Sequence, residues 1–214
     1  MFKLSQKKYI PLSKVEVQSY IDDKFSTRHI HLESESNEKC FVVAFKTLPN
    51  DSSGVAHILE HTVLCGSKKY PVRDPFFMMT RRSLSTFMNA FTASDFTAYP
   101  FSTLNDKDFS NLLSVYLDAT FFPNLNELDF MQEGHRFDFV ENDKSKDQIV
   151  LKGIVYNEMK GAMSSISSQA DQGLNENLFP NHTYGYNSGG DPQDIPKLTY
   201  QNLLKFHKKH YHPS

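Results

Sequence analysis

The chain has 214 residues, of which 39% are hydrophobic and 22% are charged, a composition typical of a globular protein with one large domain or two small ones. Its formal net charge of −2 at pH 7 gives no electrostatic reason to expect nucleic acid or a membrane surface as a partner. Its two cysteines, Cys40 and Cys65, form no CxxC pair, so we expect a reducing compartment rather than a disulfide framework.

The order of strands and helices follows from residue type and periodicity. Runs rich in β-branched and aromatic residues between turn signals predict strands, and apolar residues at helical spacing after N-cap candidates predict helices. The predicted elements are, in chain order, strands at 14–34 and 41–48, a loop at 48–54, helices at 55–65 and 76–83, a strand at 89–103, helices at 106–121 and 127–133, a strand at 136–140, and helices at 147–163, 167–179 and 199–210.

The predicted elements mix strands and helices without a regular βαβ alternation. This pattern favours the α+β class, in which helices pack on one face of a mostly antiparallel sheet. The sequence ends at HYHPS without a terminating element, so we expect residues 1–214 to be a single domain cut from a longer chain.

The segment VAHILEHTVLCGS places His57, Glu60 and His61 within five residues. At 100° per residue these three side chains lie within an arc of about 100° on a helical wheel. Two histidines four residues apart on one helix face can chelate one metal ion, and zinc accepts imidazole readily. The alternative is an amphipathic helix that exposes these polar residues. The opposite side of the helix carries the residues expected in the core, namely Ile58, Leu59, Thr62 and Val63.

A catalytic zinc ion usually has a third protein ligand, and Glu158 is the candidate. On the predicted helix 147–163 it lies on the apolar stripe, where a carboxylate is costly unless it is paired or binds a metal. A salt bridge to an arginine at the edge of the core is the alternative, but the two histidines favour a metal ligand. The stripe consists of Leu151, Ile154, Val155 and Ala162.

Three protein ligands leave one position on zinc for a water molecule, whose pKa falls to about 7. Glu60 lies on the same helix face as His61 and can remain uncoordinated, so it is the candidate general base that takes a proton from this water and passes it to a leaving amine. These residues predict a zinc-dependent enzyme that hydrolyses peptide bonds.

The HxxEH motif formed by His57, Glu60 and His61 is the inverted zinc-protease motif, and the chain around it resembles the presequence-protease group of the pitrilysin-like (insulinase) metallopeptidases. The resemblance covers about residues 50–214 and implies one zinc ion bound by His57, His61 and Glu158, with Glu60 as general base. The matching stretches are SSGVAHILEHTVLCGSKKYPVRDPFF, RSLSTFMNAFTASDFTAYPFST, DFSNLLSVYLDATFFP, LDFMQEGHRFDF, GIVYNEMKGAMS, SGGDPQDIP and FHKKHYHPS.

The resemblance also implies a place for the substrate. The family docks its peptide as an added strand near an Asn-Ala pair, here Asn89 and Ala90, which reads extended shape with little side-chain selectivity. A turn-forming role is the alternative for Asn89. Asp95 in the same segment is a candidate acceptor that orients a ligand histidine, with a capped turn as the alternative.

The sequence departs from the family at one position and in length. The pitrilysin and insulin-degrading branch has a glutamate seven residues before its third ligand, where this chain has Leu151. Enzymes of the family have four related α+β domains in two halves, and this chain matches the first. The resemblance therefore implies that the partners are unstructured peptides and the remaining domains, and that the chain alone binds zinc with little peptidase activity.

Two other interpretations remain open: a non-catalytic homologue that assembles with an active partner, and a structural metal site. For location, no apolar run is long enough to cross a bilayer and the first residues lack the apolar core of a secretory signal. We expect a cytoplasmic protein, with the mitochondrial matrix as the alternative.

Overall fold

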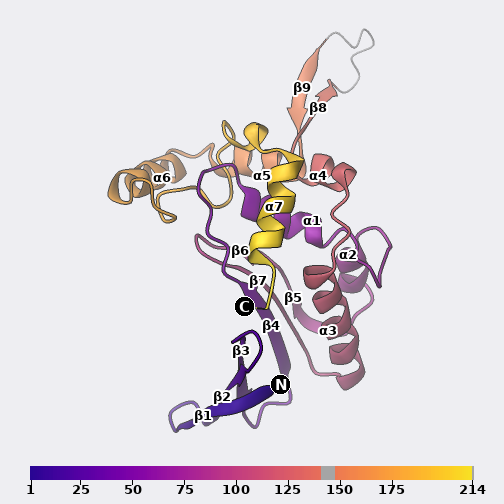
Figure 1. Ribbon diagram of the computed structural model, residues 1–214. Coiled ribbons are helices and arrows are strands. Elements are labelled where there is room, and N and C mark those ends of the chain that lie inside the picture. The colour runs from indigo at the N-terminus through magenta and orange to yellow at the C-terminus, as the bar shows by residue number, and fades with distance from the viewer. Residues whose placement is uncertain (141–147, 214) are drawn as a thin grey trace. The chain divides into compact units, whose positions relative to one another are not determined.

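The computed structural model describes residues 1–140 and 148–213. The chain divides into two compact units, one built mainly from Met1–Lys39 and the other from Cys40–Tyr211 (Figure 1). All of the candidate site residues belong to the second unit, and the division leaves the single-domain assignment a prediction. Among the described residues, no helix combines the length and the apolar character that crossing a membrane requires.

The first unit contains a three-stranded antiparallel sheet in the order β1-β2-β3. Its strands are β1 (Phe2–Ile10), β2 (Val15–Asp22) and β3 (Arg28–Glu33). We predicted one strand at 14–34, but a turn interrupts it, because the Asp22 carboxylate accepts hydrogen bonds from the backbone N–H groups of Lys24 and Phe25 and so forms an Asx turn. The strand β1 was not predicted, since its residues are all exposed and show no buried alternation.

The second unit is organised around a four-stranded sheet in the order β4-β7-β5, with β6 also paired to β7. Its strands are β4 (Lys39–Phe45), β5 (Ser85–Met88), β6 (Phe91–Thr92) and β7 (Thr97–Thr103). The pairs β5–β7 and β6–β7 are antiparallel, and the Asn89 N–H donates to the Pro100 carbonyl between them. The strand predicted at 89–103 is therefore two strands joined by a turn, and β5 was not predicted.

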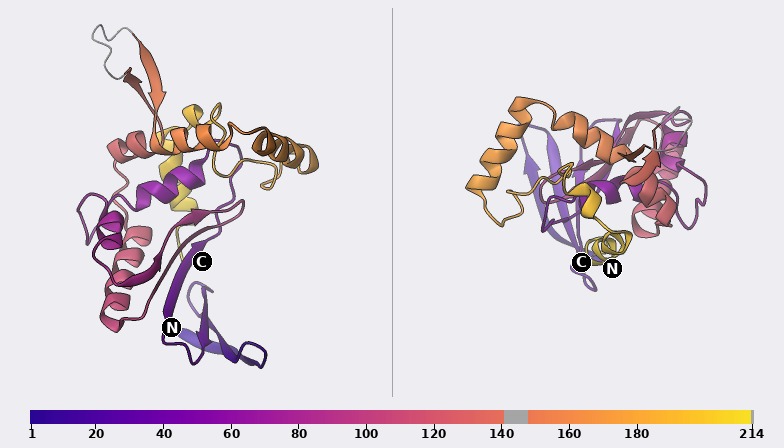
Figure 2. Two further views of the ribbon diagram at one scale, coloured as in Figure 1. Left: turned by 180° about the vertical axis from the view of Figure 1, so that it is seen from behind. Right: turned by 90° about the horizontal axis from the view of Figure 1, so that it is seen from above.

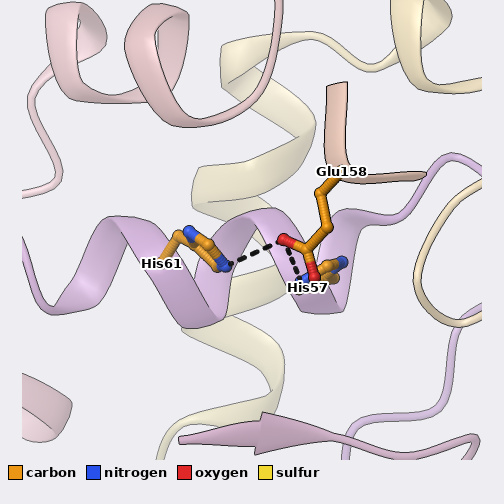
Figure 3. Close-up of side chains that lie close together, drawn as sticks. All are labelled: His57, His61 and Glu158. Carbon is orange, nitrogen blue, oxygen red and sulfur yellow. Dashed lines mark ion pairs between the residues drawn. The ribbon is translucent and has the colours of Figure 1, made fainter. Parts of the chain in front are cut away.

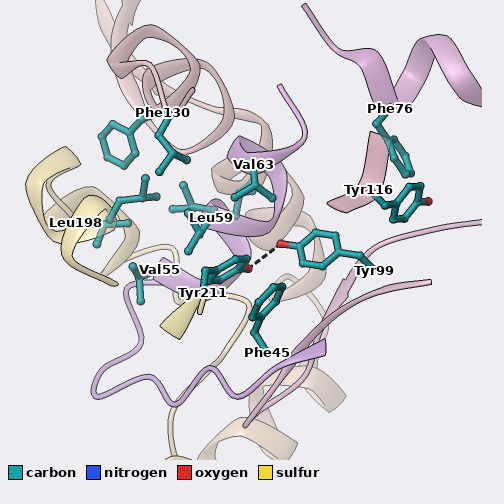
Figure 4. Packing of buried hydrophobic residues seen from close by; sticks show 14 of the residues in the cluster. Phe45, Val55, Leu59, Val63, Phe76, Tyr99, Tyr116, Phe130, Leu198 and Tyr211 are labelled. Carbon is teal, nitrogen blue, oxygen red and sulfur yellow. Dashed lines mark hydrogen bonds between the residues drawn. The ribbon is translucent and has the colours of Figure 1, made fainter. Parts of the chain in front are cut away.

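The core lies between this sheet and helices that include α1 (Val55–Val63), α2 (Pro75–Thr80), α3 (Asp106–Phe121) and α7 (Tyr200–His210). Tyr99 and Phe101 of β7 belong to it, and the Phe101 ring lies 5.0 Å from that of Tyr116. The Tyr99 hydroxyl is 2.7 Å from the Tyr211 hydroxyl (Figure 4). On the other face of the sheet, Phe87 is about half exposed. The predicted α+β architecture with helices on one face is confirmed.

Two further helices place the remaining site residues. The chain runs from α4 (Glu127–Glu133) through the antiparallel hairpin of β8 (Arg136–Phe139) and β9 (Ile149–Lys152) into α5 (Ile154–Ala162). Figure 1 and the left view of Figure 2 show that α1 lies with the strands β6 and β7 on one side and with α4 and α5 on the other. The chain then continues through α6 (Ile166–Leu178) and a short 3-10 helix at Ile195–Lys197 to α7.

The predicted helix at 147–163 is wrong in its first part; Asp147 itself lies outside the described residues. β-branched Ile149 and Val150 pair with Phe139 and Asp138, as expected of residues that favour strands. At Gly153 a Cβ atom would lie 2.0 Å from the Gly134 carbonyl oxygen, so the chain can pass between the hairpin and α5 at this point only without a side chain. The helix consequently begins at Ile154.

Candidate metal centre

The helix α1 separates its apolar and polar residues as the wheel predicted. Ile58, Leu59 and Val63 are fully buried in the core. His57 and Glu60 are also largely buried, and they line a cavity of about 520 Å³ together with His61. The polar face of α1 therefore forms a wall of a cavity rather than an open surface.

Glu158 of α5 reaches both histidines (Figure 3). Its Oε2 lies 3.7 Å from His57 Nε2 and 3.9 Å from His61 Nε2. One ligand atom from each of the three residues lies within 4.8 Å of the others, and no other such group occurs among the residues that the structure describes. Tetrahedral zinc with bonds of 2.0–2.1 Å holds its ligands about 3.3 Å apart. The two distances to Glu158 are therefore close to the separation that one ion requires.

Glu158 lies close to both histidines, but it does not lie on a buried apolar stripe as predicted. Its side chain is 53% exposed, and the buried residues of α5 are Val155 and Met159. Leu151, counted as part of its apolar stripe, belongs to β9. Because the continuous helix of the prediction does not exist, the burial penalty that we invoked does not apply to this carboxylate.

The Nδ1 atoms of both histidines are held by other groups. His57 Nδ1 lies 3.0 Å from the Gly189 carbonyl oxygen and His61 Nδ1 lies 3.2 Å from Glu133 Oε2. A carbonyl or carboxylate accepts hydrogen bonds, so each Nδ1 carries a proton, and Nε2 is the nitrogen that the neutral ring offers to a metal. These contacts therefore favour the neutral tautomer in which Nε2 faces a metal ion.

The absence of a side chain at Gly54 allows the Gly189 carbonyl to reach His57. Gly54, which precedes α1, has a φ of 69°, and a Cβ there would lie 2.8 Å from the Gly189 carbonyl oxygen. Both features exclude a larger residue without strain. The close approach places the loop around Gly189 against the first turn of α1.

Sequence reasoning missed Glu133 and Gly189. Glu133 is buried at the end of α4, three residues after buried Phe130, and this spacing was the available signal that it points inward. Gly189 contributes only its backbone carbonyl, which no side-chain pattern reveals.

The charges at the site favour a cation. Burial raises the pKa of Glu60, against the opposing effects of a hydrogen bond from Thr92 and of the two histidines. Burial lowers the pKa of His61, but the hydrogen bond to Glu133 and the neighbouring carboxylates together raise it above its usual value. Three carboxylates thus surround two imidazoles, and a divalent cation would balance this charge.

Of the other predicted residues, Asn89 and Ala90 lie at the cavity and Asp95 lies away from the histidines. Asn89 and Ala90 line the same cavity at the junction of β5 and β6, and Asn89 Oδ1 accepts a hydrogen bond from the Ala90 N–H. Asp95 lies in the turn between β6 and β7, where its carboxylate accepts a hydrogen bond from the Tyr184 hydroxyl. Since Gly189 and Glu133 hold the histidine Nδ1 atoms, the structure does not bring Asp95 to a ligand histidine.

Comparisons with known proteins agree with this arrangement. The family model described as Insulinase (Peptidase family M16) matches residues 48–167. The chain is 58% identical to the mitochondrial presequence protease of Mus musculus over 192 residues, which are 90% of this chain and 18% of that protein. It is 50% identical to the mitochondrial presequence protease of Schizosaccharomyces pombe over 213 residues, which cover this whole chain and 22% of that protein.

A solved structure shows the same fold. The crystal structure of pitrilysin superposes on 99% of this chain and 22% of its own, with a TM-score of 0.73 at 20% sequence identity. The chain spans about a fifth of the length of the curated relatives that it matches. With more than half of its residues matched by the family model, the chain belongs to the insulinase family of peptidases, peptidase family M16.

Proposed function

We propose that this chain binds one zinc ion through His57, His61 and Glu158 and forms the catalytic region of an endopeptidase that acts on short, unstructured peptides. The observation that carries the proposal is the convergence of His57 Nε2, His61 Nε2 and Glu158 Oε2, with both histidine Nδ1 atoms engaged elsewhere. Zinc in this position supplies a Lewis acid that polarises the scissile carbonyl and lowers the pKa of a bound water to about 7.

Glu60 is the proposed general base. Its carboxylate lines the cavity beside the three ligands, and burial raises its pKa toward the working range of an acid–base catalyst. It accepts a proton from the attacking water as the water oxygen bonds to the carbonyl carbon. It then donates this proton to the amine nitrogen as the C–N bond breaks.

The substrate is proposed to pair with the outer edge of β5 and β6, at Asn89 and Ala90. The sheet ends at these strands, and no other described strand is paired to them on that side. An extended peptide that adds to this edge hydrogen-bonds through its main chain and passes the cavity that contains Glu60. Unstructured peptides are the substrates that can adopt this form.

The partners and the location follow from the relatives. Because the chain spans about a fifth of their length, we propose that hydrolysis also needs regions equivalent to those outside the matched part. The chain alone then binds zinc and has little activity. The relatives are named as mitochondrial proteins, which supports the mitochondrial matrix, our alternative location, over the cytoplasm.

A structural metal site is the weaker interpretation. A closed zinc site has four protein ligands, whereas the group found in the described part of the chain has three. A non-catalytic homologue is also less well supported, since such a protein has no need for the carboxylate of Glu60 in the cavity.

Elemental analysis of the purified chain tests the metal site. We expect about one zinc ion per chain, and its loss in His57→Ala. His135→Ala is the matched control, because His135 Nε2 bonds to the Leu198 carbonyl outside the site. A wild-type chain that stays free of zinc after metal is added, or a His57→Ala variant that retains it, would overturn the assignment.

A further inference from the structure

A threonine on the sheet holds the proposed general base. Thr92 Oγ1 donates a hydrogen bond of 2.7 Å to Glu60 Oε2, although the two residues lie 32 positions apart and on different elements. Thr92 pairs in register with Thr97 of β7, whose buried side chain lies on the helix-covered face of the sheet. The Thr92 side chain therefore faces α1.

Two buried threonines continue this contact into the sheet. Thr97 Oγ1 lies 3.3 Å from Thr92 Oγ1 and 2.9 Å from Thr47 Oγ1, and both Thr47 and Thr97 are fully buried. A hydroxyl has a single proton to donate. Once Thr92 gives its proton to Glu60, its oxygen is left to accept from Thr97, and Thr97 to accept from Thr47. The three hydroxyls thus form a chain directed at the carboxylate, in which each bond polarises the next.

The two oxygens of the Glu60 carboxylate have different surroundings. Oε2 is engaged by Thr92, and none of the hydrogen bonds found in the described residues reaches Oε1. We propose that Thr92 is a positioning residue that fixes the side-chain rotamer of Glu60, so that Oε1 is the oxygen presented to the attacking water. This inference rests on the proposed function, since it assumes that Glu60 is the base.

The position of Thr92 also connects the base to the substrate edge. Thr92 is one of the two residues of β6, and β6 is where we propose that the peptide pairs. The same short strand therefore carries both the hydroxyl that holds Glu60 and part of the edge at which the peptide is proposed to pair.

The test compares Thr92→Val, which has nearly the same shape without the hydroxyl, with Thr92→Ser, which retains it. Thr120→Val is the matched control, because Thr120 Oγ1 makes a buried hydrogen bond to the Tyr116 carbonyl in α3, outside the site. The main readout is the visible absorption spectrum of the cobalt(II)-loaded chain, whose bands respond to the ligands and solvent around the metal. Crystal structures of the zinc-loaded proteins then give the Glu60 rotamer.

We expect all four proteins to bind zinc with affinities within about 3-fold, because the Thr92 hydroxyl bonds to Glu60 and Thr97 and not to a proposed ligand. Thr92→Val should change the cobalt spectrum and the Glu60 rotamer, whereas Thr92→Ser and Thr120→Val should match the wild type. In a form of the protein that hydrolyses a fluorogenic peptide, Thr92→Val should lower kcat about 10- to 100-fold with KM within about 2-fold, since a misplaced base loses part of its contribution.

The proposal is overturned if Thr92→Val matches the wild type in spectrum and rotamer, or if Thr92→Ser changes them as much as Thr92→Val. If Thr92→Val does not fold, Thr97→Val takes its place: it removes the donor to Thr92 and should give a smaller change in the same direction, and no change would overturn the proposal. A wild-type chain that binds neither metal would instead overturn the proposed function itself.

Discussion

The imidazole of His61 and the carboxylate of Glu133 are joined by a hydrogen bond, Nδ1 to Oε2 at 3.2 Å, across 72 residues of sequence. The other oxygen of Glu133 accepts a hydrogen bond from Gln132 Nε2, so the carboxylate is held on both sides. Where the pitrilysin branch has a glutamate before its third ligand, this chain has Leu151, which lies in β9. A carboxylate beside His61, a proposed ligand, is nevertheless present, supplied by α4.

Replacing Glu133 should weaken metal binding. Glu133→Ala should lower zinc affinity about 10- to 100-fold, because the partner of a ligand histidine fixes its ring and raises its basicity. Glu133→Gln should lose less, since its amide oxygen still accepts from Nδ1. A competition titration with a chromophoric chelator measures both, with Glu127→Ala on the exposed side of the same helix as control. Equal affinities for all three variants would contradict the role of Glu133.

Removing Glu158, the proposed third ligand, should have a larger effect than removing Glu133. Glu158→Ala should reduce zinc affinity by at least about 100-fold, beyond the range typical of residues that only orient a ligand. Asn157→Ala, at an exposed position of α5, should leave the affinity unchanged. The same titration measures the zinc affinity of both variants. An unaltered affinity in Glu158→Ala would require a different third ligand.

Replacing the proposed base should reduce turnover without reducing zinc binding, unlike replacing a proposed ligand. Glu60→Gln should retain about one zinc ion per chain, because Glu60 is not among the three converging ligands. In a form of the protein that hydrolyses peptides, it should lower kcat by about 10²- to 10⁴-fold. Zinc analysis and peptide cleavage are measured on the same sample, and near-normal turnover would show that Glu60 is not the base.

Gly153 should tolerate no side chain. In Gly153→Ala the new Cβ would lie 2.0 Å from the Gly134 carbonyl oxygen and 2.9 Å from His135 Cα, and both are backbone atoms that move only with the chain. We expect a loss of at least about 1–3 kcal/mol in the free energy of unfolding, measured by urea denaturation. Gly173→Ala is the control: its Cβ meets open space within a helix, so it should stabilise by up to about 1 kcal/mol.

Stability should fall on mild acidification partly because of His207. Burial lowers the pKa of His207 below its ordinary 6.5, although a hydrogen bond with the backbone of Thr120 opposes this effect. As the pH falls, the unfolded chain therefore binds the proton before the folded chain does. The stability that the folded state gains from neutral His207 is complete above about pH 6.5 and is lost as the pH falls through the folded-state pKa. His207→Phe, which keeps a ring beside Tyr211, should lose less stability between pH 7 and 5.

Thermal unfolding at a series of pH values measures this difference. Both proteins are kept free of metal with a chelator, so that the site histidines titrate equally in each. Parallel curves of Tm against pH for the wild type and His207→Phe would contradict the prediction.

Local signals in the sequence predicted the helices that depend on local interactions. The helix α3 begins and ends at the predicted residues, since Asn105 caps it with a hydrogen bond from the Asp108 N–H and its apolar spacing is regular. The histidine face of α1 also followed from spacing alone. In contrast, β9 was predicted as helix because its apolar residues fit both the helical and the strand periodicity. Its pairing with β8 makes it a strand.

Tertiary contacts explain what the sequence did not reveal at the site. Glu158 was identified through an apolar stripe that does not exist, while the contacts of Glu133, Gly189 and Thr92 join residues that are 32 to 132 positions apart. No periodic pattern encodes such pairs, because they depend on how helices and strands pack. Asp95 shows the converse, since closeness in sequence to Asn89 did not bring it to a histidine.

The long-range hydrogen bonds of the two histidines set an order of events during synthesis. His61 can be held only after residue 133 has left the ribosome, and His57 only after residue 189, since their partners lie 72 and 132 residues further along the chain. A nascent chain that stops before Gly189 has both imidazoles and the glutamates but lacks the carbonyl that fixes the first ring. Competence to hold a metal ion in this geometry is therefore acquired late, when the last of these elements docks.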